Sequence, residues 1–308
     1  MFSQKEKTFK SSRKNSSFQA YIWEPDQLVQ KKAIIQICHG AAEHSLRYHN
    51  FAKFLAENGY VVIACDYLGH GKSANGHFGF VSQNNGHKIL AKDTFLITEF
   101  AKNEYHLPII IIGFGVGSLI ARYTCSLFGI EYDAAIFMGT FDGSIYMNSL
   151  ARILPKNFKN KKEKEARLIS KLSTKIHNRN FKNSEFGNSY LTRDENEVKI
   201  YESDPLCGFP LTYSAYRDIL RLSLIVNSKK WAEKMPKNIP IYLISGLEDP
   251  LGHFGRGVIK IYGDLVESGS KNIEIKLYEY ARHCLLFELN KDEVYSDILN
   301  WIGELEAI

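Results

Sequence analysis

The chain of 308 residues contains no hydrophobic run long enough to cross a bilayer. Its most apolar stretch, residues 108–121, is shorter than the roughly 20 residues that a spanning helix needs, and glycines interrupt it. The stretch is better explained as a buried strand that enters a turn. The first ten residues are polar and charged, and no apolar stretch behind them resembles a secretory signal. We therefore expect a cytoplasmic protein.

Cysteine is scarce, odd in number and scattered. No pair has the CxxC spacing of a metal or redox site, which argues against a disulfide framework and against zinc. We expect no metal ion, and we expect the thiols to be reduced packing groups, including the one beside His283. The five cysteines are Cys38, Cys65, Cys125, Cys207 and Cys284.

Acidic residues are fewer than basic ones, 34 against 39, which gives a net charge of +5. Much of the basic excess lies between Arg152 and Lys182. The structural explanation of this run is a solvated helical face. The functional explanation is attraction to an anionic membrane surface that is bound transiently. No recognised nucleic-acid-binding motif accompanies the run, so we do not expect a nucleic acid partner.

Short apolar runs alternate with stretches of helical periodicity. This alternation predicts a parallel sheet with helices on both faces. A hairpin at one edge of the sheet is predicted from residues 7–12 and 18–23. The further predicted strands are 33–38, 60–65, 109–112, 134–138, 241–244 and 273–278, and the predicted helices are 48–58, 89–103, 118–128, 258–267 and 293–305.

Residues 142–237 break this alternation, and their pattern is mostly helical, basic and amphipathic. An insertion at this point lies over the carboxyl ends of the strands, where open α/β sheets bind their ligands. We therefore predict two units. One is an α/β core formed by residues 1–141 and 238–308, and the other is a helical cap formed by residues 142–237.

A glycine-rich turn follows one of the predicted strands, where Gly113, Gly115 and Gly117 alternate with Phe114 and Val116. Two kinds of site fit these glycines. One is a dinucleotide-binding loop, and the other is the GxSxG nucleophile elbow, whose small residues allow a sharp strand-to-helix bend. A dinucleotide loop belongs on the first strand–helix unit, with an acidic residue about 20 positions later. This turn comes on a later unit, so we favour the elbow and expect no cofactor.

Two other loops carry specific motifs. The run HGAAEH at 39–44, followed by Arg47 and Tyr48, resembles the HGxxEHxxRY loop of the monoacylglycerol lipase and lysophospholipase family, and residues 66–73 match its DxxGHGxS turn. The stretches 190–195 and 203–209 are similar to its bacterial lysophospholipase branch. This family is grouped with the S33 serine aminopeptidases. The resemblance implies the α/β-hydrolase fold, a mostly parallel eight-stranded sheet with helices on both faces and a helical cap inserted after the sixth strand.

The same resemblance implies roles for residues that are far apart in the sequence. Asp249 and His283 follow successive predicted strands in the family's order of acid before histidine, which implies an orienting carboxylate and a general base. Ala41 and Val116 would supply the backbone N–H groups of an oxyanion hole, which stabilises charge on a carbonyl oxygen. Gly115 stands where the family has its serine nucleophile.

Gly115 leaves two functional interpretations open. The resemblance implies a carboxylic ester hydrolase that acts on lysophospholipids or monoacylglycerols through a serine, a histidine and an aspartate. Without the serine hydroxyl no acyl-enzyme forms, and turnover falls on the order of a millionfold, so the chain as written is then an inactive esterase. The alternative is a member of the same fold that binds a lipid or a protein partner without cleaving it. Ser118 lies one helical turn beyond Gly115, and we expect it to pack rather than to replace the nucleophile.

Overall fold

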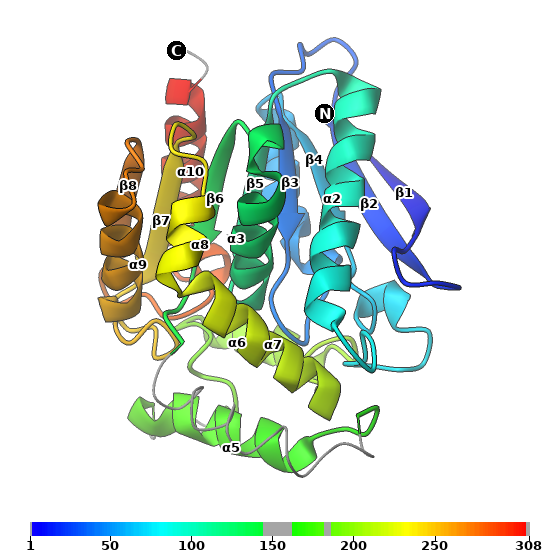
Figure 1. The fold of residues 1–308 in the computed structure, drawn as a ribbon, viewed down its shortest axis with the longest axis vertical. Coiled ribbons are helices and arrows are strands. Elements are labelled where there is room, and N and C mark those ends of the chain that lie inside the picture. Colours follow the sequence, from blue (N-terminus) through cyan, green and yellow to red (C-terminus); the bar gives the residue numbers. More distant parts are fainter. Residues whose placement is uncertain (1, 144–161, 182–185, 306–308) are drawn as a thin grey trace.

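The computed structural model describes residues 2–143, 162–181 and 186–305. Its centre is one sheet of eight strands in the order β1-β2-β4-β3-β5-β6-β7-β8 (Figure 1). β2 is antiparallel to both of its neighbours, and all other neighbouring strands are parallel. The strands are β1 (Phe2–Lys10), β2 (Ser17–Pro25), β3 (Ile34–Cys38), β4 (Val61–Cys65), β5 (Ile109–Phe114), β6 (Ala134–Met138), β7 (Ile241–Gly246) and β8 (Ile273–Tyr278).

The central strands are buried on both faces of the sheet. Every residue of β3, β4, β5, β6 and β7 is buried, and strands of this kind have continuous apolar sequences because helices cover both of their sides. The edge strand β1, by contrast, is exposed along most of its length and carries lysine and glutamate side chains. Charged side chains keep an edge strand from pairing with another chain.

Helices cover both faces of this sheet. α1 and α10 contribute apolar side chains to the core on one face, and α2, α3 and α9 contribute to the core on the other. These helices are α1 (His49–Glu57), α2 (Gly86–Tyr105), α3 (Val116–Phe128), α9 (Arg256–Glu267) and α10 (Lys291–Leu305). Short 3-10 helices are η1 (Ser45–Tyr48), η2 (Gly71–Ala74), η3 (Gly129–Glu131), η4 (Asn178–Asn180) and η5 (Leu285–Phe287).

Between β6 and β7 the described residues form four further α-helices. They are α5 (Arg167–His177), α6 (Glu195–Ser203), α7 (Tyr213–Val226) and α8 (Lys229–Lys234). α5 is the outermost of these helices and lies well below the lower end of the sheet in Figure 1. α7 and α8 pack against α3, and α8 also contacts α9. After β6 the chain thus leaves the sheet and places α5 beyond one end of the sheet. It returns to β7 through α7 and α8, which pack against α3.

The predicted fold class is confirmed, including the edge hairpin and the helical insertion after the sixth strand. β6 and β8 begin and end where the sequence predicts. β5 continues to Phe114 and α3 begins at Val116, earlier than predicted, so the turn between them consists of Gly115 alone. Much of the basic run, residues 152–161 and Lys182, lies outside the described residues. Among the helices of the described segments, none has the length and apolar character that a bilayer-crossing helix needs.

Candidate functional site

Gly115 forms the bend between β5 and α3. Its backbone angles, φ 53° and ψ −119°, lie in a region that residues with a Cβ adopt only with strain of roughly 1–3 kcal/mol. Its N–H donates to the carbonyl oxygen of Met138, and its carbonyl oxygen accepts from the hydroxyl of Ser118 at 2.5 Å. Ser118 is fully buried, which confirms its packing role. Hydrogen bonds at the N–H and at the carbonyl oxygen of Gly115 therefore fix the bend.

The glycines on either side of the bend are required by close contact with the backbone. A Cβ on Gly117 would overlap the carbonyl oxygen of Cys38, and a Cβ on Gly113 would lie 2.6 Å from the carbonyl oxygen of Gly117. In a close-packed interior such contacts force the backbone apart. Both positions thus have the small residues that a nucleophile elbow needs.

His283 and Asp249 reach this bend from the ends of β8 and β7. Nδ1 of His283 lies 2.9 Å from Oδ2 of Asp249, and both residues are buried. Oδ1 of the same carboxylate accepts from the N–H of Leu251 at 2.9 Å. Because the carboxylate accepts from Nδ1–H, the ring is assigned the tautomer in which Nε2 is an acceptor. This Nε2 would lie 3.0 Å from a Cβ on Gly115, so the structure brings Gly115, His283 and Asp249 into one cluster.

Ala41 and Val116 line the same cavity, although one lies in a loop and the other begins a helix. Val116 is the first residue of α3, so its N–H has no acceptor within the helix and lies at the positive end of the helix dipole. Ala41 belongs to the loop after β3, which we call the oxyanion loop (residues 39–44). The fold thus brings Ala41 and Val116, which are far apart in the sequence, to one cavity.

Glu43 holds the oxyanion loop in place from inside the protein, where it is 2% exposed. Its Oε1 accepts from the N–H of Gly40 and from the hydroxyl of Tyr48, each at 2.6 Å, and the carboxylate is paired with Arg47. Burial alone would raise the pKa of Glu43, but the charge of Arg47 and the hydrogen bond from Tyr48 outweigh burial and lower it. Glu43 is therefore an ionised support of the loop rather than a proton donor.

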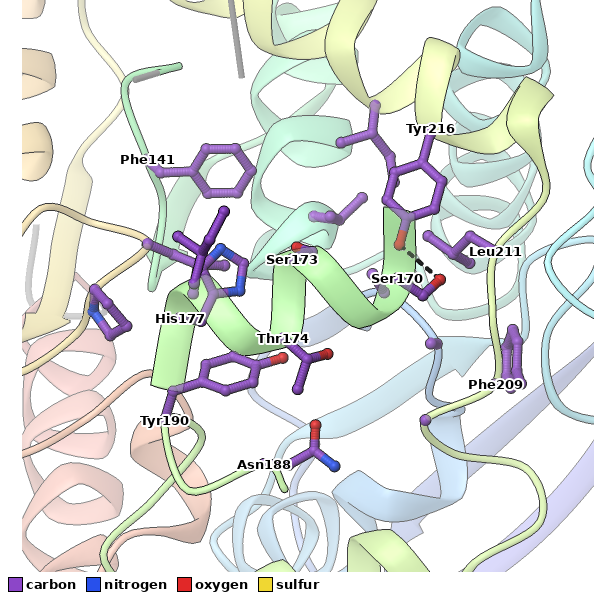
Figure 2. A pocket seen from close by; sticks show the side chains of 18 of the residues that line it. Phe141, Ser170, Ser173, Thr174, His177, Asn188, Tyr190, Phe209, Leu211 and Tyr216 are labelled. Carbon is purple, nitrogen blue, oxygen red and sulfur yellow. Dashed lines mark hydrogen bonds between the residues drawn. The ribbon is translucent and has the colours of Figure 1, made fainter. Parts of the chain in front are cut away.

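A cavity of about 240 Å³ lies against helix α5, and Ala41 and Val116 are among its lining residues. Figure 2 shows Ser170, Ser173, Thr174 and His177 along α5, with the aromatic rings of Phe141, Tyr190, Phe209 and Tyr216 around the helix. A cavity with mostly apolar walls and a few polar groups is typical of a site for a small apolar ligand. Further apolar lining residues are Ile176, Leu211, Ile219, Leu220, Pro250 and Leu251.

His177 is a cavity residue that the sequence analysis did not single out. The ring of His177 lies 5.1 Å from the ring of Tyr190, which in turn lies 6.4 Å from the ring of His283. Burial and the nearby His283 lower the pKa of His177 to about 4, so its imidazole is neutral near pH 7. The signal that could have revealed it is the helical spacing of Ser170, Thr174 and His177, a polar face on a helix otherwise apolar and basic.

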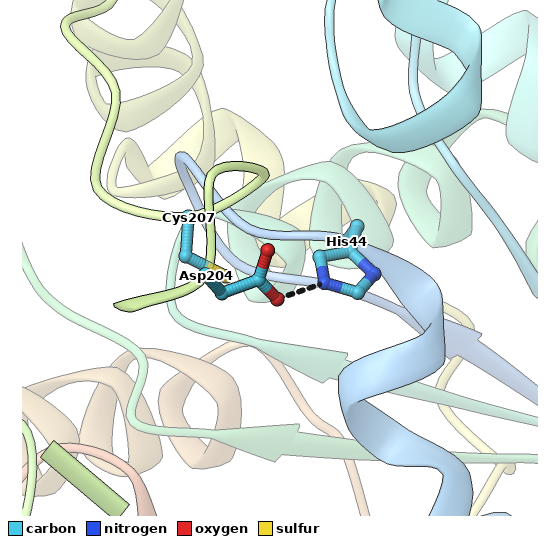
Figure 3. A group of neighbouring side chains, drawn as sticks. All are labelled: His44, Asp204 and Cys207. Atoms are coloured by element: carbon cyan, nitrogen blue, oxygen red, sulfur yellow. Dashed lines mark hydrogen bonds and ion pairs between the residues drawn. The ribbon is translucent and has the colours of Figure 1, made fainter. Parts of the chain in front are cut away.

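His44, Asp204 and Cys207 form a second cluster, which joins the oxyanion loop to the segment after α6 (Figure 3). Nε2 of His44 lies 2.8 Å from Oδ2 of Asp204, and Oδ1 of Asp204 accepts from the N–H of Leu206. The three potential ligand atoms lie within 4.8 Å of one another, but burial raises the pKa of the Cys207 thiol and disfavours the thiolate that a metal ion needs. These groups fit a structural link better than a metal centre.

All five cysteines are buried and free. Burial also raises the pKa of the Cys284 thiol, next to His283 in the sequence, well above its ordinary value. A buried neutral thiol is a poor nucleophile, so the packing role predicted for the cysteines is confirmed by their burial.

The fold, the bend at Gly115 and the pairing of His283 with Asp249 define an α/β-hydrolase. The family model described as serine aminopeptidase, S33, matches residues 29–290, and the chain belongs to this family. It is 28% identical to human monoglyceride lipase over 283 residues, which are 90% of this chain and 84% of the lipase. It is 24% identical to the monoacylglycerol lipase of Mycolicibacterium smegmatis over 293 residues, 91% of each protein.

A solved structure shows the same likeness in three dimensions. A highly thermostable carboxyl esterase from Bacillus coagulans, in complex with glycerol, superposes with a TM-score of 0.91 and is 28% identical, over 98% of this chain and 99% of the esterase. The resemblance to the monoacylglycerol lipase and lysophospholipase family that the motifs indicated is thus confirmed.

Proposed function

We propose that the chain carries the active-site framework of a carboxylic ester hydrolase for monoacylglycerols or lysophospholipids, with Gly115 at the position of the nucleophile. The observation that supports this most is the orientation of His283. Its Nε2 faces the bend at Gly115, while Asp249 holds the opposite ring nitrogen. A histidine located between a carboxylate and the residue at such a bend is the arrangement that activates a serine hydroxyl.

A serine at position 115 would act in two steps. Its oxygen would attack the ester carbonyl carbon while His283 takes the hydroxyl proton, and the N–H groups of Ala41 and Val116 would stabilise the oxyanion. His283 would then give the proton to the departing alcohol, and water would hydrolyse the acyl-enzyme. Glycine has no oxygen for the first step, so in this proposal the chain as written forms no acyl-enzyme.

The cavity supports a single-chain lipid as the ligand. Its walls are mostly apolar side chains, and the hydroxyls of Ser170 and Thr174 lie along one side of it. Relatives of the chain are named monoglyceride lipases, and the similar esterase was solved with glycerol. Residues 142–237 act as the cap in this proposal, with α5 as the wall farthest from the sheet. The cytoplasmic location expected from the sequence stays a prediction.

The decisive experiment restores the hydroxyl with Gly115→Ser. The restored protein should hydrolyse nitrophenyl butyrate and a monoacylglycerol, and a fluorophosphonate probe should label it. The imidazole must give way slightly, because a Cβ at this position lies 3.0 Å from Nε2. The matched control is Gly115→Ser with His283→Ala, which keeps the serine and removes the base. A folded Gly115→Ser protein with neither turnover nor labelling would show that the catalytic interpretation is wrong.

A second candidate function is lipid binding without cleavage, and Gly115 is the observation that favours it. The cavity walls and the cap are independent of the missing hydroxyl, so an acyl chain can still be held. Binding of a fluorescent fatty acid should then be unchanged by His283→Ala and weakened by Leu220→Trp, which fills the cavity. Absence of measurable fatty-acid or lysolipid binding would remove this candidate.

We also propose that α5 contacts an anionic membrane surface. Leu168, Leu172 and Ile176 recur at intervals of four residues and are 79%, 49% and 37% exposed. Arg167, Lys171 and Lys175 precede each of them by one position, so an exposed apolar stripe runs beside a basic one. This combination is typical of helices that lie on a lipid surface.

Co-sedimentation with vesicles tests the membrane contact. Binding to phosphatidylserine vesicles should exceed binding to phosphatidylcholine vesicles, and Leu168→Ser with Leu172→Ser should abolish the excess. Leu247→Ser, at a half-exposed site after β7, is the control variant. Equal binding to both kinds of vesicle would contradict the proposal.

A further inference from the structure

The space beside Gly115 borders the imidazole of His283 and little else. Apart from its chain neighbours, the described atoms within 4 Å of a Cβ on Gly115 are Nε2 of His283 at 3.0 Å and Cε1 of the same ring at 3.6 Å. The elbow glycines Gly113 and Gly117 differ, because a Cβ on either would meet the backbone. Apart from chain neighbours, only the imidazole therefore borders position 115, and a ring nitrogen faces it.

The distance and the protonation state of this nitrogen suit a small hydroxylic molecule. The Cβ position itself is bonded to Cα, so the oxygen of a bound molecule must lie farther from Gly115, and such an oxygen about 3 Å from Nε2 is at hydrogen-bond distance. Nδ1–H of His283 donates to Asp249, so Nε2 is an acceptor and a base. An O–H group held beside Gly115 would donate its hydrogen to Nε2, and its oxygen would lie near the place where the oxygen of a serine would otherwise react.

We infer that this space binds water as a nucleophile and that the chain hydrolyses activated esters in a single displacement, without an acyl-enzyme. This inference rests on the proposed function, since it uses the same base and the same oxyanion donors. The water oxygen forms a bond to the ester carbonyl carbon while one water proton passes to Nε2. The carbonyl π electrons move to the oxygen that faces the N–H groups of Ala41 and Val116.

The intermediate then collapses. The carbonyl double bond forms again, the bond between carbon and the alcohol oxygen breaks, and the proton on Nε2 passes to the departing oxygen. The products are one carboxylic acid and one alcohol, and His283 returns to its neutral state. Because the water is not tethered to the chain, the reaction is far slower than with serine, and its rate depends strongly on the leaving group. Nitrophenyl esters should therefore react, whereas monoacylglycerols should be nearly inert.

The test compares four proteins on nitrophenyl butyrate: the chain itself, Gly115→Ala, His283→Gln and Gly115→Ser. The methyl group of alanine would lie 3.0 Å from Nε2 and would crowd a water held there, so Gly115→Ala should lower the rate about tenfold or more. His283→Gln should lower it about a hundredfold, the usual size of a general-base contribution. Pretreatment with a fluorophosphonate should leave the activity of the chain unchanged and abolish that of Gly115→Ser.

A further measurement needs no variant. Methanol is a second small hydroxylic molecule, and its addition should raise the rate of nitrophenol release and yield methyl butyrate. Loss of the activity after fluorophosphonate treatment would overturn the inference, because a serine would then be responsible. Full activity in His283→Gln, or in a folded Gly115→Ala, would also overturn it. If Gly115→Ser is active and labelled while the chain itself fails, this inference alone is wrong. If Gly115→Ser also fails, the proposed function is wrong as well.

Discussion

Nε2 of His44 lies 2.8 Å from Oδ2 of Asp204, and this contact joins the oxyanion loop to the segment between α6 and α7. A second link lies beside it, because the carbonyl oxygen of Ala42 accepts from the N–H of Gly208 and from the hydroxyl of Tyr201. Ala42 has a φ of 50°, a left-handed conformation that favours glycine. The position of the neighbouring Ala41 N–H therefore depends on contacts with the cap.

The variant Asp204→Asn should loosen this link. Replacing a charged hydrogen-bond acceptor costs about 1–3 kcal/mol, which lowers the melting temperature by several degrees in a protein of this size. In the Gly115→Ser background it should also lower kcat/KM, because the oxyanion donor that we propose at Ala41 is then less well held. Thermal unfolding and ester hydrolysis measure the two effects, with Glu57→Gln at an exposed position of α1 as the control. An unchanged melting temperature would contradict the structural role of the pair.

The elbow should not tolerate Gly117→Ala. The added methyl would overlap the carbonyl oxygens of Cys38 and His39, so we expect a loss of about 3 kcal/mol or more in the free energy of unfolding. Gly263→Ala is the matched control, since nothing lies within 4 Å of a Cβ at this position of α9. In a helix this control should be neutral or stabilising by about 0.5–1 kcal/mol. Urea unfolding of both variants measures these free energies, and equal stabilities would refute the prediction.

Stability should fall as the pH drops from about 6.5 to about 4. Burial is the main cause that lowers the pKa of His39 and of His177 to about 4 and that of His70 to about 3. Below about 6.5 the unfolded chain binds protons that the folded chain still excludes, so the free energy of unfolding decreases by about 1.4 kcal/mol per pH unit for each such group. His177→Gln should make this slope shallower, whereas replacing the exposed His77 should not. Urea unfolding across this pH range gives the slopes, and identical slopes for all three proteins would refute the assignment.

Arg122 should be essential for packing α7 against the core. Its guanidinium is fully buried and donates to the carbonyl oxygen of Val226 and to Oδ1 of Asn227 at the end of α7. Burial lowers its pKa to about 9, so it remains charged at pH 7. Arg122→Met should cost about 3 kcal/mol, because these acceptors lose a charged donor. Arg221→Met, on the exposed side of α7, should change the free energy of unfolding little, and a similar loss in both variants would contradict this role.

Predictions from local pattern succeeded for short apolar or alternating strands and failed where a distant residue ends an element. The strands at 134–138 and 273–278 were predicted to the residue. The helix predicted over 89–103 instead begins at Gly86. Asp218 of α7 accepts from the N–H of Gly86 and from the ring of His87, and no local pattern could reveal a partner so far along the chain.

The residues of the candidate site also fall into two groups, those that the sequence could identify and those that it could not. The residues at the ends of strands, Gly115, Asp249 and His283, could be named from motifs because each motif is a short run of neighbouring residues. His177 could not be named in this way, since its place in the site depends on how α5 packs over the sheet.

The order of strands and helices, the glycines that permit a sharp bend and the residue types at each strand end were determined by the sequence alone. These properties arise from neighbouring residues and from burial of continuous apolar runs. Only the tertiary structure decided that Nε2 of His283 faces Gly115 and that the segment after α6 holds the oxyanion loop. The contact between His44 and Asp204 joins residues 160 positions apart, and packing between such distant segments is settled only when the whole chain folds.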